Sequence, residues 1–257
     1  MGSSIEDSIV GVIAAMQENL GERFTIDDMA RIAMFSKFHF CRAFRASTGM
    51  SPARFLAALR LQEAKHLLVS TSDGIAEISN KVGYTSVSTF TTRFSASVGV
   101  TPGVFRAQRG RTSHPRTCDQ HTPAKGGGAV IQGKVSASAP YDDSTVYLGL
   151  FRDVVPEGTP IRSLALDKPG VFEIGHVPDG TWHLLAYTAT PPRLPGSDGV
   201  RLSVPRSAIA AQGPFHVSQG SVLSCVDLRL RSTRATDPPV LVAPFDARWE
   251  PAMATVG

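Results

Sequence analysis

Two short stretches of the chain repeat one another, and they constrain its fold more than any other feature. MFSKFHFCRAFR and, further on, VGYTSVSTFTTRF each place two phenylalanines four residues apart behind a polar turn. The pairs are Phe40 with Phe44 and Phe90 with Phe94, so the second pair follows the first at an offset of 50 residues. Residues four apart lie on one face of an α-helix. The chain is therefore expected to build the same half-buried helix twice.

Each of these helices is expected to follow a shorter helix across a tight turn. The four helices are predicted at 26–33, 36–46, 75–82 and 86–97. Two helices joined in this way form a helix-turn-helix, whose second helix enters the major groove of DNA. The second turn contains Gly83, which suits a left-handed backbone, whereas the first turn has Met34 at the comparable place.

Three further helices complete the first half. Ser4 is expected to cap the first, whose apolar residues recur on one face until Gly21. Ser51-Pro52 opens a long helix to about residue 69, and Thr101-Pro102 opens the last. At 1.5 Å per residue the long helix spans roughly 27 Å. Because successive major-groove turns on one DNA face lie roughly 34 Å apart, a linker of this order suits two recognition helices.

The rest of the chain differs in composition. Only three of the 18 prolines (Pro52, Pro102, Pro115) precede residue 117. Strand-like runs such as VIQGKVSAS, STVYLGLFR, VFEIGHV and TWHLLAYTA follow, separated by turn signals. We therefore predict two domains: an all-α double helix-turn-helix of seven helices, then a small all-β antiparallel sandwich of six or seven strands. Their expected limits are 1–109 for the helical domain, 110–128 for a flexible linker, 129–245 for the sandwich and 246–257 for a tail.

Charge follows the same division. Residues 22–111 contain 13 Lys and Arg against 6 Asp and Glu, a net of +7, whereas residues 117–257 contain 12 against 13, a net of −1. A basic first half attached to a neutral second half is typical of a nucleic-acid binder with an appended module. A generic basic surface is the alternative.

The helical wheel assigns faces to the two repeated helices. With the paired phenylalanines inside, the outward faces carry small, polar or basic groups, with Phe38 as the exception. The DNA-facing candidates on the first recognition helix are Ser36, Lys37, Phe38, Cys41, Arg42 and Arg45. The candidates on the second are Ser86, Val87, Ser88, Thr91, Thr92 and Arg93, and Ser95 is also expected to point outward.

Residues 5–109 resemble the DNA-binding domain of AraC/XylS-type bacterial transcription regulators. The resemblance is carried by MARIAMFSKFHFCRAFRASTGMSPARFLAALRLQEAKHLL and by IAEISNKVGYTSVSTFTTRFSASVGVTPGVFR. It implies a monomeric unit whose two recognition helices read adjacent segments of the major groove of double-stranded DNA. It also implies contact with RNA polymerase and, most often in this family, activation of transcription.

The resemblance places Arg42 where the family contacts bases, and a bidentate bond to guanine is the expected role. A solvated surface arginine is the alternative. Phe38 is expected to pack on a thymine methyl or a sugar, with packing between helices as the alternative. Lys37 and Arg45 are expected at phosphates. Many relatives have an arginine where this chain has Thr92. The second helix is therefore expected to position the protein more than to select sequence.

Other chemistries find little support in the sequence. The three cysteines (Cys41, Cys118, Cys225) and the histidines show no metal-ligand spacing, so neither a zinc site nor a cofactor is expected. No nucleophile elbow, phosphate-binding loop or dinucleotide fingerprint appears. No apolar run is long enough for a membrane span and the N-terminus lacks signal-peptide features, which together with the sparse cysteines predicts a cytoplasmic, non-enzymatic protein.

The second half resembles the prealbumin-like repeat of carboxypeptidase regulatory domains. The shared features are an opening G-x-V strand, an aromatic second strand and Val-Pro-Asp-Gly before a further strand. The resemblance implies a β-sandwich that packs or binds, with an effector or a protein as its partner. Two hypotheses besides a regulator therefore stay open. One is a scaffold or interaction protein that acts through this β-module. The other is an enzyme within the β-module, which no group of candidate catalytic residues in the sequence supports.

Overall fold

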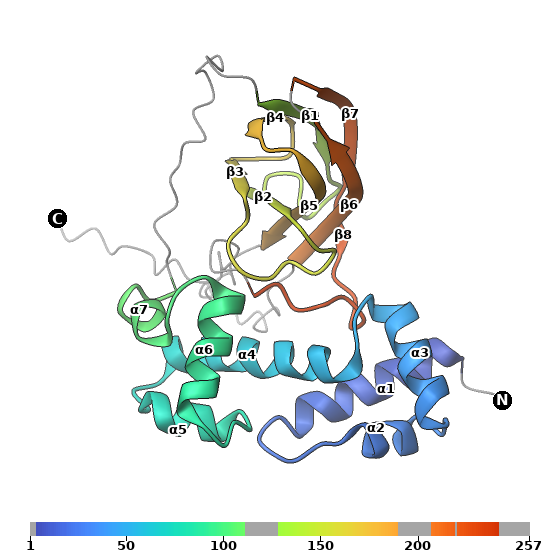
Figure 1. The fold of residues 1–257 in the computed structure, drawn as a ribbon, viewed down its shortest axis with the longest axis vertical. Helices are drawn as coiled ribbons and strands as arrows, with labels where there is room; N and C mark the ends of the chain where they lie inside the picture. The colour runs from blue at the N-terminus through green and yellow to red at the C-terminus, as the bar shows by residue number, and fades with distance from the viewer. Residues whose placement is uncertain (1–3, 111–127, 190–206, 219, 242–257) are drawn as a thin grey trace, which may run out of the picture. The chain divides into compact units, whose positions relative to one another are not determined.

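The computed structural model describes residues 4–110, 128–189, 207–218 and 220–241, which form two compact units (Figure 1). The helical unit comprises the chain up to Gly110 together with Arg234–Leu241. The β-unit comprises the described residues from 128 to 233. Nearly all of the predicted linker and the whole predicted tail lie outside the described residues.

The seven predicted helices are all present in the helical unit. They are α1 (Ile5–Glu18), α2 (Ile26–Ile32), α3 (Lys37–Thr48), α4 (Pro52–Ser70), α5 (Ile75–Lys81), α6 (Val87–Val98) and α7 (Pro102–Ala107). Serine or threonine side chains cap six of them by accepting a bond from the backbone N–H of the third helical residue; the caps are Ser4, Thr25, Ser36, Ser51, Ser86 and Thr101. Each helix therefore begins where its own sequence satisfies the free N–H groups.

The 50-residue repeat of the sequence is also a repeat of packing. In the first half the ring centroids of Phe40 and Phe44 are 5.5 Å apart, and those of Phe44 and Phe55 are 5.4 Å apart. In the second half Phe90, Phe94 and Phe105 form the same chain of rings, with spacings of 5.7 and 5.6 Å. All six rings are buried. Three of the four pairs are edge-to-face and the pair of Phe90 and Phe94 is tilted. Such aromatic pairs add to the free energy of burial and fix how each recognition helix is seated.

The two turns share one hydrogen-bond pattern. In the first turn the N–H of Met34 donates to Arg31 O and that of Phe35 donates to Ala30 O. In the second turn the same bonds recur 49 residues later, from the N–H groups of Gly83 and Tyr84 to Asn80 O and Ser79 O. This is the Schellman end of a helix, which needs a left-handed residue after the cap. Met34 takes that conformation, with φ of 58°, as Gly83 does with φ of 81°.

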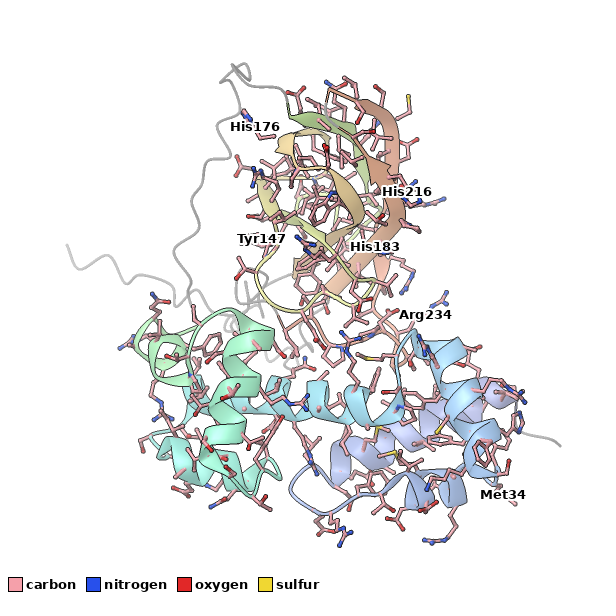
Figure 2. The ribbon with its side chains drawn as sticks, in the orientation of Figure 1. Met34, Tyr147, His176, His183, His216 and Arg234 are labelled. Carbon is pink, nitrogen blue, oxygen red and sulfur yellow. The ribbon has the colours of Figure 1, made fainter. Side chains whose placement is uncertain are left out.

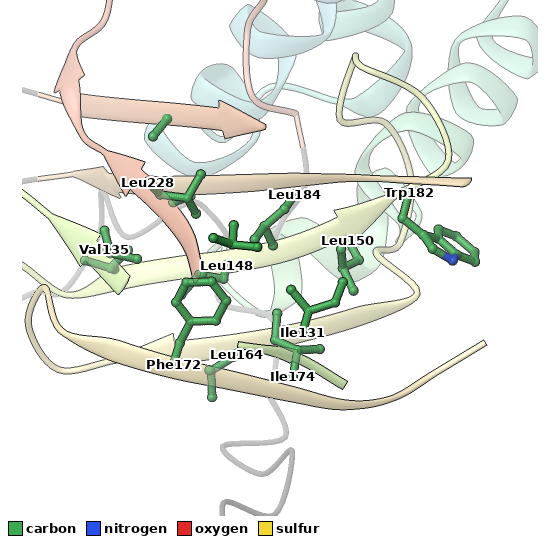
Figure 3. Close-up of a cluster of buried hydrophobic side chains, with 14 of the residues drawn as sticks. Ile131, Val135, Leu148, Leu150, Leu164, Phe172, Ile174, Trp182, Leu184 and Leu228 are labelled. Atoms are coloured by element: carbon green, nitrogen blue, oxygen red, sulfur yellow. The ribbon is translucent and has the colours of Figure 1, made fainter. Parts of the chain in front are cut away.

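The β-unit contains eight strands in two sheets. The strands are β1 (Ala129–Ser136), β2 (Val146–Phe151), β3 (Arg162–Leu166), β4 (Val171–Val177), β5 (Gly180–Ala189), β6 (Ser207–Val217), β7 (Val222–Arg229) and β8 (Arg231–Ser232). One sheet has the order β4-β1-β7 and the other the order β3-β2-β5-β6-β8. A single cluster of buried side chains draws on both sheets, with Ile131, Phe172 and Ile174 facing Leu148, Leu150 and Leu184 (Figure 3).

The predicted antiparallel arrangement is wrong for one strand pair, because β1 and β7 run parallel. β7 follows β6 of the other sheet, so it reaches β1 by crossing between sheets and not through a hairpin, which would impose antiparallel pairing. Gly133 of β1 allows the approach, since a Cβ there would lie 2.0 Å from Val226 O. The G-x-V signature thus marks the place where two backbones meet.

The sequence and the structure also divide the chain differently after the last strand. The β-module is predicted to reach residue 245, whereas Arg234–Leu241 clusters with the helical unit. These eight residues have no periodicity of their own, so only their contacts reveal where they belong. The helical unit is therefore built from two pieces of sequence that the β-unit separates.

Gly83 and Gly11 provide a matched test of the turn. A Cβ at Gly83 would lie 2.4 Å from Leu20 O and 2.8 Å from the Arg60 guanidinium carbon, whereas nothing lies within 4 Å of one at Gly11 in α1. We expect Gly83→Ala to lower the free energy of unfolding by more than about 2 kcal/mol, since it combines a left-handed backbone with a clash. Gly11→Ala should raise it by roughly 0.5–1 kcal/mol. Urea denaturation measures both, and equal effects would contradict this account of the turn.

Candidate nucleic-acid interface

The outer face of α3 is basic, with one exposed aromatic ring. Phe40 and Phe44 hold the inner face in the core, which turns Phe38, Arg42 and Arg45 outward. The Phe38 side chain is 90% exposed, so packing between helices, the alternative for this residue, does not occur within the described residues. Arg42 and Arg45 take part in no ion pair within the part of the chain that the structure describes. This face can therefore offer two guanidinium groups and one apolar ring to a ligand.

Other predicted residues of the first helix have internal partners. Lys37 Nζ lies 3.0 Å from Asp27 Oδ1, which joins the start of α3 to α2. Ser36 Oγ caps α3 by accepting from the His39 N–H. Cys41 is half-buried with a free thiol. The Ser36 hydroxyl is thus used in capping the helix. The charge of Lys37 is partly neutralised by Asp27, which weakens the attraction of Lys37 to a phosphate.

The outer face of α6 is smaller and nearly uncharged. Val87, Ser88, Thr92 and Arg93 are exposed, and Thr91 is half-buried. Ser86 Oγ caps the helix and also lies 2.8 Å from Ser88 Oγ. Arg93 is the single basic residue of this helix. The chemical contrast between α3 and α6 that the sequence predicted is therefore present in the folded unit.

One predicted orientation is wrong and two exposed residues were missed. Ser95, expected to point outward, is half-buried, and its hydroxyl donates to Thr91 O at 2.7 Å because a helical serine can bond the preceding turn. Met34 is 90% exposed on the turn before α3 (Figure 2). Thr89 is exposed in the first turn of α6. Two features of the sequence could have indicated this exposure: Met34 lies in a turn, and Thr89 lies on the outer side of the helical wheel.

Arg60 of α4 fixes the two halves relative to one another. Its Nε donates to Leu20 O at 2.9 Å and its Nη2 donates to Glu22 O at 2.7 Å, so it holds the connection between α1 and α2. The same guanidinium lies beneath Gly83, whose turn also approaches Leu20 O. Half-burial lowers the pKa of Arg60, and burial raises the pKa of the neighbouring Tyr84. The α1–α2 connection of the first half thus meets the turn of the second helix-turn-helix, so the two halves are not held together by α4 alone.

Arg106 of α7 fixes the far end of α4. Its Nε donates to Leu68 O at 3.2 Å and its Nη2 donates to Asp73 O at 2.6 Å. Asp73 also bonds Lys81, and bonds to Asp73 and Glu77 raise the pKa of Lys81 to about 12. The 19 residues of α4 give an axial length of about 28 Å. α4 with Arg60 and Arg106 therefore sets the separation of α3 and α6 (Figure 1).

The described residues supply no metal site, since no group of three or more His, Cys, Asp or Glu gathers among them. Cys41 and Cys225 are free, and Cys118 lies outside the described ranges. None of the described helices is both long and apolar enough to cross a bilayer.

Comparison with known proteins agrees with the doubled helix-turn-helix. Residues 29–108 match the family described as a helix-turn-helix domain. The HTH-type transcriptional regulator YobQ of Bacillus subtilis is 34% identical over 94 residues, 37% of this chain and 39% of that protein. The transposon Tn10 TetD protein of Escherichia coli is 34% identical over 101 residues, 39% of this chain and 73% of that protein. The chain belongs to the AraC family of helix-turn-helix proteins.

Other family members share the same part of the chain. The RCS-specific transcriptional activator RclR of Escherichia coli is 36% identical over 95 residues, 37% of this chain and 34% of that protein. The chain thus spans about two-fifths or less of the length of YobQ and RclR. A solved AraC-type regulator from Chromobacterium violaceum matches with 28% identity and a TM-score of 0.38, covering 43% of this chain and 96% of that one.

Replacing Arg60 tests its bonds to Leu20 O and Glu22 O, which are called the brace. We expect Arg60→Met to lower the free energy of unfolding by about 1–3 kcal/mol, because the carbonyls of Leu20 and Glu22 lose their donor. Arg23→Met removes the same charge from an exposed residue of the same connection, and it should change stability by less than about 0.5 kcal/mol. Thermal and urea unfolding measure both variants. The brace is refuted if the two variants behave alike.

Proposed function

We propose that this protein is a sequence-specific DNA-binding transcription regulator of bacteria that reads two adjacent segments of the major groove. The observation that carries the proposal is the doubled element: α3 and α6 are seated by the same trio of rings and joined by a braced α4. A single amphipathic helix has many uses. Two equivalent helices joined by one braced helix are what a protein needs in order to reach two successive segments of the major groove.

The first recognition helix supplies base selection in this proposal. Arg42 is exposed and free of ion pairs within the described residues, so its fork can bond the O6 and N7 of guanine. The exposed Phe38 ring suits a thymine methyl group. Arg45 and the Asp27-paired Lys37 suit phosphates, which set affinity and register more than sequence. Cys41 is half-buried at the flank of this face, and Ser36 caps the helix that carries it.

The second recognition helix has a lesser share in selection. Ser88 and Thr92 are exposed hydroxyls that accept or donate without strong preference for one base. Val87 is 41% exposed and offers an apolar contact. Thr91 lies at the flank, and Arg93 suits a phosphate. With Ser86 as its cap, α6 would anchor the protein one groove segment away from α3.

The expected sign of regulation is activation through RNA polymerase, acting in the cytoplasm where the chromosome lies. The names of two relatives, RclR and AarP, describe them as transcriptional activators.

The β-unit is proposed to be a prealbumin-like sandwich, because its two sheets share one core. Its proposed partner is an effector or a protein. The β-unit follows the DNA-binding part, whereas the sensing domain of many AraC-type proteins precedes it, so the β-unit is not equated with that sensing domain.

Arg42→Ala tests base selection. On sites recovered by genome-wide occupancy of the full chain, we expect affinity to fall roughly 5- to 150-fold, which corresponds to about 1–3 kcal/mol for one bidentate contact. Discrimination at one base pair should relax with it. Arg93→Ala is the matched control: if Arg93 touches a phosphate, its loss weakens all sequences alike and reduces the salt slope by about 1. Titrations at several salt concentrations separate the two.

A second function stays open because α6 offers so little charge. In that case the β-unit is the active part, as a scaffold or interaction module, and the helical unit no longer selects DNA. This alternative predicts diffuse chromosomal occupancy that Arg42→Ala leaves unchanged. Sharp peaks that are lost in the variant would exclude it.

A further inference from the structure

The residues after the last strand form part of the helical unit. We call Arg234–Leu241, the sequence RATDPPVL, the strap. Its carbonyl groups meet the ammonium group of Lys65 in α4: Nζ donates to Leu241 O at 2.8 Å and to Val240 O at 3.5 Å. Lys65 is only 4% exposed, and Leu241 is 1% exposed. The strap therefore covers one face of the helix that separates the two recognition helices.

The strap is built to dock in one shape. The N–H of Arg234 donates to Asp237 Oδ2 at 2.7 Å and the N–H of Asp237 donates to Arg234 O at 3.1 Å, which closes a turn at its start. Pro238-Pro239 follows, and consecutive prolines hold the chain extended. Because local bonds and prolines favour this shape without the helical unit, they reduce the conformational entropy lost when Leu241 is buried.

Undocking of the strap would not leave the Lys65 ammonium group without hydrogen-bond partners. A lysine ammonium that gives up two backbone carbonyls can bond water in their place, provided that the strap leaves and exposes it. A wholly apolar contact would lack this alternative. Lys65 is thus suited to a surface that is covered in one state and solvated in another.

A line of contacts runs from the strap to the second recognition helix. Lys65 Nζ lies 5.9 Å from the centre of the Phe105 ring in α7, within the range of a cation–π attraction. Phe105 packs on Phe94, and Phe94 packs on Phe90, both of α6. In the corresponding trio of the first half the third ring is Phe55, which lies on α4 itself and packs on Phe44.

We propose that the face of α4 and α7 around Lys65 is a docking surface whose occupant is the chain's own strap, and that strap docking stabilises the seating of α6 but not that of α3. The strap begins directly after the last residue of the β-unit. A partner or effector that pulls on β8 would therefore change the second recognition helix selectively. This step rests on the proposed function only where it concerns DNA.

Hydrogen exchange of the full chain without DNA tests the docking by itself. Leu241→Ala removes the buried anchor of the strap, and Lys65→Ala removes its receptor. Each is expected to speed amide exchange in α6 and α7 at least fivefold while leaving α3 and the β-strands unchanged. The double variant should exchange no faster than the faster single variant, because both remove the same contact. Ala235→Ser, at an exposed strap residue, is the control and should match the wild type.

Two results would overturn the docking. Unchanged exchange in both variants would show that the strap does not hold α6, and equal acceleration in α3 and α6 would show a general loss of stability. Footprinting on a recovered site then tests the consequence for DNA. Leu241→Ala should lose protection over the half of the site contacted by α6 and keep the other half. Altered exchange with an unchanged footprint would refute the coupling, whereas a wild-type chain without any footprint would refute only the proposed function.

Discussion

The meeting of Arg60, Leu20 and Gly83 is the contact on which the geometry of the helical unit depends. One guanidinium on the linking helix bonds the carbonyls of the first half and lies beneath the turn of the second. A side chain on Gly83 would occupy the same space, so a tight turn and a close approach require the same glycine. The two recognition helices are therefore held at one separation. A fixed separation suits DNA, whose major-groove segments recur at a regular spacing along one face.

The two helix-turn-helix elements share a frame and differ in what they present. The frame consists of three rings, a Schellman turn, a serine cap and a left-handed glycine at the end of each recognition helix, at Gly49 and Gly99. The outward side chains are free of this frame, so they can diverge without cost to folding. The same frame can therefore present a basic face with an exposed ring on α3 and hydroxyl groups on α6.

The strap changes how the chain should be divided. The β-unit is not simply attached to the end of a DNA-binding unit; its sequence is inserted before the last eight residues of that unit. An inserted domain has two connections to its host, and one of them here leads into a contact with α4. The proposed role of the strap rests on this second connection.

The sequence determined the local elements of this protein. The caps at Ser4, Thr25, Ser36, Ser51 and Thr101, the seven helices and the outward direction of Phe38 and Arg42 all follow from periodicity and from short-range hydrogen bonds, which involve residues close in the chain. The offset of 50 residues also predicted the duplication, since equal spacing of aromatic residues produces equal packing.

Tertiary structure decided what depends on residues far apart in the chain. The parallel entry of β7, the bond of Arg60 to a loop 40 residues away and the docking of Leu241 on Lys65 have no local signature. Such contacts are selected by which buried groups remain to be satisfied once the local elements have packed, and only the folded chain presents that choice.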